Sequence, residues 1–581
     1  MKIKNCLPTE EGKFKIILLG ILLLGFFLRV YGLNWDQGNH LHPDERAIVM
    51  FALPLKLPST FSEFFSIQSP WNPHFFAYGS FPLYLLKISG NILSNFDPLL
   101  GSYDKINLVG RAISAFFDLG SLFVIFLLAK KLFNKKIALL AGFFYAISTL
   151  PIQLAHFYAV DTILTFFITL TLYCLINFYE KPNFKNSLFV GFFFGLSLAT
   201  KTSALVLILA IGTAIAIDFI LIFLKNPHRP HTWFPHIPKF LKRLFVDGIT
   251  MTAATTITFL LAEPYALIDF KEFWKQTLEQ SQMTRDAFTF PYTLQYVGKT
   301  PYLYELKNVF LWGLGPVLAT LSFLGLFYFS YKAIKQLASP QGGSNNKAVI
   351  LLVFFIIYFA VVGKFAVGWM RYMLPLYPLL CLFGGLFAWH LLKFIQNKFS
   401  HHKFSIFNFK FLILLALLAW PLSFMHIYSK PNTRVLASEW INQNIPPGAT
   451  LAIEHWDDSL PLFGQQNYNI LTLTLYDPDT SEKWQILNDQ LLKTDYIVIA
   501  SNRLHVPLQK LTDCEKLKPH PCYRETASYY KKLFSGKLGF RKVVEFENSP
   551  TIPIINILIN DQGADESFTV YDHPKVLIFK K

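Results

Sequence analysis

Long apolar runs are the feature of this sequence that most limits how the chain can fold. Of its 581 residues, 53% are hydrophobic and only 15% are charged, and the mean hydropathy is +0.37. Soluble proteins are nearer one quarter charged, and a helix needs about 20 apolar residues to cross a bilayer. The runs therefore predict a multi-pass α-helical membrane protein with about 11 transmembrane helices. The expected spans are Phe14–Leu33, Leu108–Ala129, Ile137–Leu150, Ala159–Phe178, Leu188–Ala199, Ala204–Leu224, Gly248–Ala262, Val309–Tyr331, Ala348–Val362, Tyr372–Leu392 and Phe411–Tyr428.

Basic residues lie mostly in the short segments on one side of these expected spans. They include Lys13 and Lys15, Lys130 and Lys131, Lys135 and Lys136, Lys332 and Lys335, and Lys393 and Lys398. Cytoplasmic loops are enriched in Lys and Arg, so we expect a plasma-membrane protein with a cytoplasmic N-terminus. The first run lacks a small-residue cleavage site and is expected to be a retained signal anchor. The same bias accounts for the net charge of +16, so we expect membrane lipids and no nucleic acid as partners.

The composition changes after the last expected span. We expect residues 1–428 to form the transmembrane domain, with an outer loop over residues 34–107. Residues 429–581 are expected to form a soluble extracytoplasmic α/β domain, because strand-like segments such as Leu451–Glu454 and Tyr496–Ala500 appear there. About 150 residues suffice for one small domain of this class.

Two cysteines in this tail, Cys514 and Cys522, lie close together in a segment rich in charge and proline. Disulfides form in oxidising compartments outside the cytoplasm, so the expected location of the tail permits a bond between them. A zinc site that includes His520 is the alternative, but it lacks further ligands at suitable spacing. The sequence leaves open whether the two cysteines are bonded.

An acidic pair, Asp44–Glu45, follows the first expected span, where the chain leaves the bilayer. A carboxylate at a membrane boundary is costly to desolvate unless it is paired or has a function. A solvated loop is the simplest alternative. A second acid, Asp161, begins another expected span at the same outer face, which favours a shared site. These acids are candidates for a catalytic base.

Several basic residues lie on the outer face, against the usual charge bias. They are Arg46, Arg111, Lys201, Lys364 and Arg371. Long basic side chains can extend toward lipid headgroups, which would explain some of them. Cations beside acids also suit a site in which Lys or Arg holds a lipid-linked phosphate while a carboxylate deprotonates an acceptor. We expect the donor phosphate to be bound by Lys364, Arg371, Lys201 and Tyr372.

This combination predicts glycosyl transfer from a polyprenyl-phosphate donor at the outer membrane face. The phosphate leaves as a stable anion and needs charge stabilisation, whereas the acceptor hydroxyl needs a general base, which contributes a factor of about 10² to 10⁴. A retaining reaction needs a second carboxylate as nucleophile, and adjacent Asp44 and Glu45 cannot easily face one anomeric carbon, so inversion is favoured. The acids Asp44, Glu45 and Asp161 could instead hold a divalent metal ion. Cations at the phosphate make a metal dispensable, so we expect no metal and no cofactor.

The sequence resembles the GT-C glycosyltransferases, in the branch of the dolichyl-phosphate-mannose–protein mannosyltransferases and lipid A aminoarabinose transferases. The segments that carry the resemblance are His42–Glu45, the span containing Arg111, His156 to Asp161, Gly195–Lys201 and Arg371–Pro378. The resemblance implies a GT-C-type membrane domain, a lipid-monophosphate sugar as donor and Asp44 as the catalytic base. It also implies that Glu45 and Asp161 shape the catalytic pocket, and we expect Arg46, Arg111 and His156 to line it.

The acceptor and two other functions stay open. The chain lacks the β-trefoil insertion of eukaryotic protein mannosyltransferases, so the acceptor could be a protein, a lipid or a glycan. Trp71 and Tyr78 are candidates for lining the sugar pocket, whereas Glu454–Asp458 in the tail is interpreted as a solvated loop. A transporter or flippase would place charges near the bilayer centre in paired halves. A membrane-anchored binding protein would not need so many spans or the outward cations.

Overall fold

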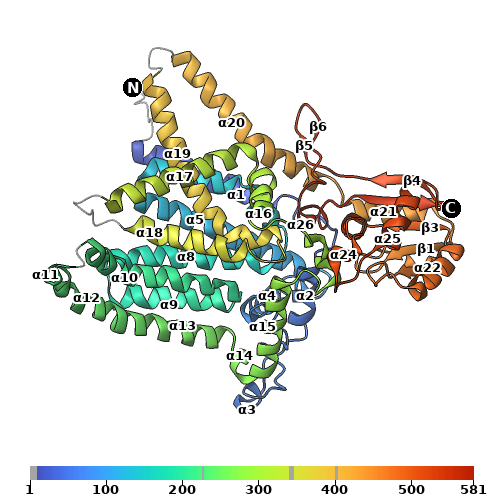
Figure 1. Ribbon diagram of the computed structural model, residues 1–581, viewed down its shortest axis with the longest axis horizontal. Helices are drawn as coiled ribbons and strands as arrows, with labels where there is room; N and C mark the ends of the chain where they lie inside the picture. Colours follow the sequence, from blue (N-terminus) through green and yellow to red (C-terminus); the bar gives the residue numbers. More distant parts are fainter. Residues whose placement is uncertain (1–8, 226–227, 339–345, 399–402) are drawn as a thin grey trace.

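The apolar runs become helices that lie side by side, and a small sheet domain lies at one end of this bundle (Figure 1). The computed structural model describes residues 9–225, 228–338, 346–398 and 403–581. Among these residues, seven helices are long and apolar enough to cross a membrane, or eight if the bent pair α6 (Lys135–Ala146) and α7 (Thr149–Ala155) is one span. The multi-pass helical fold is therefore confirmed, whereas the count of about 11 spans is not.

Each expected span falls on a helix of the bundle, although some of these helices are short. Besides α6 and α7, the bundle helices are α1 (Glu10–Val30), α5 (Ile106–Leu132), α8 (Val160–Glu180), α9 (Phe184–Leu198), α10 (Leu207–Lys225), α13 (Gly248–Ala262), α17 (Pro316–Ala338), α18 (Lys347–Val362), α19 (Tyr377–Lys398) and α20 (Lys403–Met425). Helices α9 and α18 have 15 and 16 residues, and α6 and α7 are bent by 57°. Because these helices are short, fewer helices than the roughly 11 expected are long enough to cross a bilayer.

A charged pair lies inside the bundle, where α1, α5 and α6 meet. Arg29 Nε is 2.5 Å from Asp118 Oδ2, and both side chains are fully buried. The Tyr145 hydroxyl donates to Asp118 Oδ1 at 2.6 Å, and Arg29 Nη1 donates to the carbonyl of Ala146 at 3.0 Å. Charges are tolerated inside a bundle when they are paired and hydrogen-bonded. We interpret this pair as a structural link between the three helices.

The acidic motif forms the first turn of a helix, α2 (Pro43–Ala52). His42 caps this helix, since its Nδ1 accepts a hydrogen bond from the backbone N–H of Glu45 at 3.3 Å. Burial lowers the pKa of His42 to about 3, which keeps the imidazole neutral and able to accept. Proline at the first position and acids in the first turn both favour a helix start. Asp44 is therefore held on a helix and not on a solvated loop.

The other outer segments also form short elements, and α4, α14 and α15 lie near α2 at the sheet end of the bundle (Figure 1). These segments contain α3 (Phe61–Phe64), α4 (Ser80–Leu93), η1 (Pro98–Gly101), η2 (Thr202–Val206), α14 (Tyr265–Ile268), α15 (Phe270–Arg285), η5 (Pro291–Tyr296), α16 (Leu303–Asn308), η6 (Val309–Gly313), η7 (Met370–Leu376) and η8 (His426–Ser429). The opposite end carries α11 (Pro230–Trp233), η3 (Phe234–His236), α12 (Ile237–Lys242) and η4 (Arg243–Asp247).

The sheet domain, residues 433–580, contains a five-stranded sheet with the strand order β2-β1-β3-β7-β4 and a separate two-stranded sheet. β1 is parallel to β2 and β3, whereas β7 is antiparallel to β3 and β4. The strands are β1 (Thr450–Glu454), β2 (Asn469–Leu473), β3 (Tyr496–Ile499), β4 (Arg541–Phe546) and β7 (Val576–Lys580), and β5 (Thr551–Ile552) pairs with β6 (Ile557–Leu558). The helices are α21 (Thr433–Asn444), α22 (Ser481–Lys493), α23 (His505–Leu508), α24 (Cys514–Leu517), α25 (Arg524–Phe534) and α26 (Glu566–Thr569), with η9 at Gln465–Asn467. The expected α/β content is confirmed.

Cys514 and Cys522 form a disulfide within this domain. The bond decides between the two alternatives that the sequence left open, because a disulfide-bonded sulfur is not a thiolate ligand for zinc.

A buried histidine joins the sheet domain to the bundle. His573 Nε2 is 2.8 Å from Asp561 Oδ2, and its Nδ1 is 2.5 Å from Asp572 Oδ1. Asp572 Oδ2 in turn accepts from the Tyr428 hydroxyl at 2.8 Å and from Gln153 Nε2 at 3.1 Å, both in the bundle. Burial alone would lower the pKa of His573, but the two carboxylates outweigh it and raise the pKa to about 10.

The His573 contact predicts a pH dependence of stability. Since the pKa is raised from 6.5 to about 10, protonation favours the folded state, so the stabilisation is complete below pH 6.5 and is lost as the pH rises through the folded pKa. His573→Gln should therefore lower the melting temperature most at about pH 6 and least at about pH 10. Thermal melts of both proteins in detergent measure this difference. An effect of equal size across the range would show that His573 is not charged in the folded protein.

Candidate active site

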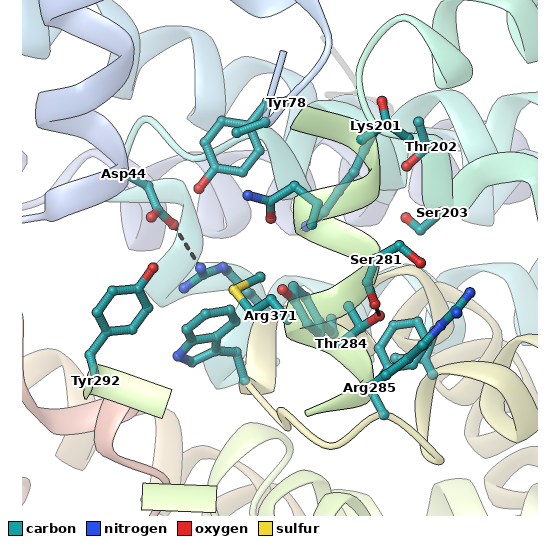
Figure 2. A pocket seen from close by; sticks show the side chains of 18 of the residues that line it. Asp44, Tyr78, Lys201, Thr202, Ser203, Ser281, Thr284, Arg285, Tyr292 and Arg371 are labelled. Carbon is teal, nitrogen blue, oxygen red and sulfur yellow. Dashed lines mark hydrogen bonds and ion pairs between the residues drawn. The ribbon is translucent and has the colours of Figure 1, made fainter. Parts of the chain in front are cut away.

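A cavity of about 1420 Å³ lies where the sheet domain meets the bundle. Its wall comes from α2, from the segments that carry Lys201 and Arg371, from α15 and from loops of the sheet domain. Figure 2 shows Asp44, Tyr78 and Tyr292 on one side of this space, with Lys201 and the hydroxyl-bearing residues on the other. Residues far apart in the sequence thus form one polar centre.

Asp44 extends from the first turn of α2 into the cavity. Its Oδ2 is 2.9 Å from Arg371 Nη2, and 18% of the side chain is exposed. The Tyr78 hydroxyl also hydrogen-bonds to this carboxylate. Burial alone would raise the pKa of Asp44, but the Arg371 guanidinium, together with the Tyr78 hydrogen bond and the charge of Lys201, outweighs it and holds the pKa below its ordinary value. Asp44 is therefore ionised at neutral pH and can accept a proton.

Arg371 connects Asp44 to a second ion pair. Asp161, in the first turn of α8, is 2.7 Å from Lys201 Nζ, and its other oxygen is 3.7 Å from Arg371 Nε. Lys201 lies 4.5 Å above the ring of Tyr372, a favourable cation–π contact. Arg371 Nε is buried and has no hydrogen-bond partner within the described residues. The charges alternate along this row.

A close backbone contact places Tyr78 beside Lys201. The N–H of Gly79 donates to the carbonyl of Thr200 at 3.1 Å. A Cβ at Gly79 would lie only 1.8 Å from the carbonyl oxygen of Ala199, so any side chain there would force the two segments apart. The glycine lets the first outer loop lie against the turn that carries Lys201.

The cavity has a polar side and an apolar side. Hydroxyl and guanidinium groups from α15 line the polar side, namely Ser281, Thr284 and Arg285 (Figure 2). The apolar side comes from bundle helices and their ends, namely Leu198, Leu205, Phe259, Ile357, Val361 and Phe365. Leu205 and Val361 are 52% and 43% exposed. Such a cavity can hold a molecule with a charged head and an apolar chain.

Six of the ten residues expected in the catalytic pocket and the phosphate site line this cavity, and one lies directly behind it. Asp44, Arg46, Lys201, Lys364, Arg371 and Tyr372 are in its wall. Asp161 contacts Lys201 and Arg371 from behind. Of the two sugar-pocket candidates, Tyr78 lines the cavity, whereas Trp71 lies outside it and stacks on Tyr84 at 4.8 Å.

The expected pocket positions of Glu45 and Arg111 need correction. Arg111 Nη2 is 2.7 Å from Glu45 Oε1 and 2.6 Å from Asp36 Oδ2, and all three side chains are fully buried. The Tyr158 backbone N–H also donates to Glu45 Oε2 at 2.9 Å. Successive helix residues are rotated by about 100°, so Glu45 faces the bundle when Asp44 faces the cavity. Glu45 therefore cannot share a metal ion with Asp44 and Asp161.

His156 is also displaced from its expected position in the pocket. It is fully buried, its ring nitrogens lie 2.8 Å and 2.9 Å from the carbonyls of Ile152 and Tyr31, and it stacks on Tyr428 at 3.9 Å. These contacts hold the His156 ring inside the bundle, where it joins helix ends. Among the described residues, no group of three or more His, Cys, Asp or Glu side chains is placed to hold a metal ion.

Sequence reasoning missed the contribution of the sheet domain to the cavity. Its loops contribute Trp456, Asp457, Asp458, Arg503, Glu566 and Tyr571. The first three lie in the segment interpreted as a solvated loop, which is wrong, because Glu454 is 3% exposed and the Asp457 side chain is 2% exposed. The signal in the sequence that could have indicated a binding surface was the combination of acidic residues with Trp456 in this segment.

Comparisons with known proteins agree with this architecture. Residues 104–234 match the family model for dolichyl-phosphate-mannose-protein mannosyltransferase. No curated protein gives a significant match.

Among solved structures, the Archaeoglobus fulgidus oligosaccharyltransferase in the apo form is similar with a TM-score of 0.51 and 13% identity, over 86% of this chain and 71% of that chain. The AglB oligosaccharyltransferase of the same organism, in complex with an inhibitory peptide and a dolichol-phosphate, has the same score and identity over 95% and 75%. ArnT from Cupriavidus metallidurans bound to undecaprenyl phosphate has a TM-score of 0.45 and 13% identity over 86% and 95%. The fold of the chain is thus similar to that of these oligosaccharyltransferases, and its residues 104–234 are similar to the dolichyl-phosphate-mannose-protein mannosyltransferase family.

Proposed function

We propose that this chain is an inverting glycosyltransferase that moves a sugar from a polyprenyl-phosphate donor to a hydroxyl group of an acceptor. The observation that carries the proposal is the ionised Asp44 beside the Arg371 and Lys201 cations in one cavity with an apolar side. This one cavity thus provides a general base for the acceptor, a binding site for the donor phosphate and an apolar surface for the lipid chain.

The donor occupies the cavity with its phosphate at the cations. Arg371, Lys201, Lys364 and Arg285 line the space. Guanidinium and ammonium groups stabilise the phosphate charge that develops as the glycosidic bond breaks. The polyprenyl chain lies along the apolar side and continues into the bilayer. Support comes from AglB, a protein of similar fold whose solved complex contains a dolichol-phosphate.

The reaction is a single displacement. Asp44 accepts the proton of the acceptor hydroxyl while that oxygen bonds to the anomeric carbon. The bond between the anomeric carbon and the phosphate oxygen breaks, its electron pair stays on the phosphate, and polyprenyl phosphate leaves as an anion. Glu45 faces away and Asp161 is held by Lys201 at 2.7 Å. No second carboxylate among these is free to act as a nucleophile, which favours inversion over retention.

The reaction takes place at the outer face of the plasma membrane in this proposal. The sheet domain lies at the end of the bundle opposite α11 and α12 (Figure 1). Lys239 and Lys242 lie in α12, and such residues favour the cytoplasm. The N-terminus is then cytoplasmic and the sheet domain extracytoplasmic.

The two other functions receive less support from the described residues. A transporter needs charges that can release a substrate across the bilayer, whereas the buried Arg29–Asp118 pair is satisfied by hydrogen bonds within the bundle. In a binding protein whose spans serve only as an anchor, the binding site would lie in the sheet domain. Here most of the polar cavity is built from the bundle and its outer loops.

Removing the proton acceptor tests the role of Asp44. Asp44→Asn should lower sugar transfer by a factor of about 10² to 10⁴, the usual contribution of a general base. Binding of the donor should persist, because the substitution removes a negative charge beside the phosphate site. Release of polyprenyl phosphate from a short-chain donor measures turnover. Asp97→Asn, on the outer loop beyond α4, is the matched control, and near wild-type turnover by Asp44→Asn would exclude Asp44 as the base.

Replacing Arg371 should affect both donor binding and the pH profile. Arg371→Ala removes charge-assisted hydrogen bonds of about 1.5–3 kcal/mol, so donor affinity should fall by roughly 10- to 100-fold. The pKa of Asp44 should rise because its main counter-charge is lost, which shifts the acidic limb of kcat/KM to higher pH. Arg371→Lys keeps the charge, controls for folding and should recover part of the affinity. Unchanged donor affinity in Arg371→Ala would remove this residue from the phosphate site.

A further inference from the structure

The sheet-domain side of the cavity has no role in the steps described above. It carries two aromatic residues, Trp456 and Tyr571, and two ion pairs that include Asp458 and Glu566. These groups lie in the same cavity as the base Asp44. They are therefore placed to contact the molecule that receives the sugar.

Trp456 is held in a strained backbone conformation with its ring left accessible. Its φ is +75°, a left-handed value that bulky residues rarely adopt. Arg503 Nη1 donates to the carbonyl of Trp456 at 3.2 Å and fixes this turn. The residue is nevertheless 42% exposed. Strain combined with an exposed large aromatic ring is typical of ligand contacts, where the surroundings compensate for the unfavourable conformation.

A row of aromatic rings leads from Trp456 to the catalytic centre. The ring centroids of Trp456 and Tyr292 are 5.9 Å apart, and those of Tyr292 and Trp369 are 6.2 Å apart. Arg371 Cζ lies 4.5 Å from the Trp369 ring. Figure 2 shows Tyr292 on the same side of the cavity as Asp44. Pyranose rings have an apolar C–H face that stacks on aromatic rings, so the row offers two successive platforms beside the base.

The charged groups on this wall neutralise one another. Arg46 Nη1 is 3.2 Å from Asp458 Oδ1, and Asp458 Oδ2 is 3.0 Å from the buried Arg434 Nη1. Arg503 Nε is 2.7 Å from Glu566 Oε1. Paired carboxylates and guanidiniums can still accept from and donate to hydroxyl groups at their free positions. The wall therefore suits a ligand rich in hydroxyl groups and without a strong net charge.

We infer that the sheet domain forms the acceptor site and that the acceptor is a neutral saccharide of at least two units. Its terminal sugar lies against Tyr292 with one hydroxyl directed at Asp44, and the preceding sugar stacks on Trp456. The ion pairs of Asp458 and Glu566 hydrogen-bond to its hydroxyl groups. This inference rests on the proposed glycosyl transfer and names the substrate class of the same site.

Trp456→Gly tests the inference while it relieves the backbone strain at this position. Glycine adopts φ of +75° freely, which offsets the greater entropy of glycine in the unfolded chain, so the variant should fold while it lacks the stacking ring. The full-length protein in nanodiscs, with polyprenyl phosphate added, is applied to an array of neutral oligosaccharides and to an array of peptides. The wild type should bind a subset of the oligosaccharides, and Trp456→Gly should bind them at least about tenfold more weakly.

Two further variants complete the experiment. Trp456→Phe keeps an aromatic ring and should retain most of the binding, whereas Trp440→Ala, on α21 outside the cavity wall, should bind as the wild type does. Binding to peptides and not to oligosaccharides would overturn the inference, as would no binding to either array or unchanged binding by Trp456→Gly. Release of polyprenyl phosphate by the wild type is measured separately. Its absence would refute glycosyl transfer itself, whatever the arrays show.

Discussion

The geometry of the cavity depends on the buried ion network of Arg111. This residue, on α5, holds Asp36 and Glu45 at 2.6 Å and 2.7 Å with all three side chains removed from solvent. A fully buried Arg with two carboxylates is stable only when its hydrogen bonds are satisfied in a well-defined geometry. The network therefore fixes the rotation of α2 about its axis. Because Glu45 is held toward the bundle, its neighbour Asp44 is directed toward Arg371.

A second constraint comes from the sheet domain, which completes the cavity. The carboxyl ends of β1 and β3 lead directly into the loops of Trp456, Asp458 and Arg503. His573 and its two carboxylates attach the domain to the bundle through Tyr428 and Gln153. The bundle thus provides the charges and the apolar side, whereas the domain provides aromatic rings and neutralised ion pairs. This division separates the chemistry of the donor from that of the proposed acceptor.

The sequence predicted the chemistry of the site better than its geometry. Asp44, Lys201 and Arg371 were singled out because outward charges at a membrane boundary need a reason, and all three line the cavity. Glu45 and Arg111 were singled out by the same reasoning but serve a buried network, because a sequence does not reveal which face of a short helix is buried. Trp456 and Asp458 were underestimated, since their place in the cavity wall depends on contacts with a distant part of the chain.

The sequence by itself determined that this chain is a bundle of apolar helices with one basic side, since bilayer thickness and charge bias act on local composition. It also determined that an acidic pair, Asp44–Glu45, follows the first span. Only the tertiary structure decided which acid faces the cavity, how many helices are long enough to cross a bilayer, and which residues form the wall opposite the base. These features depend on contacts between residues hundreds of positions apart, such as Arg46 with Asp458, and no local pattern encodes them.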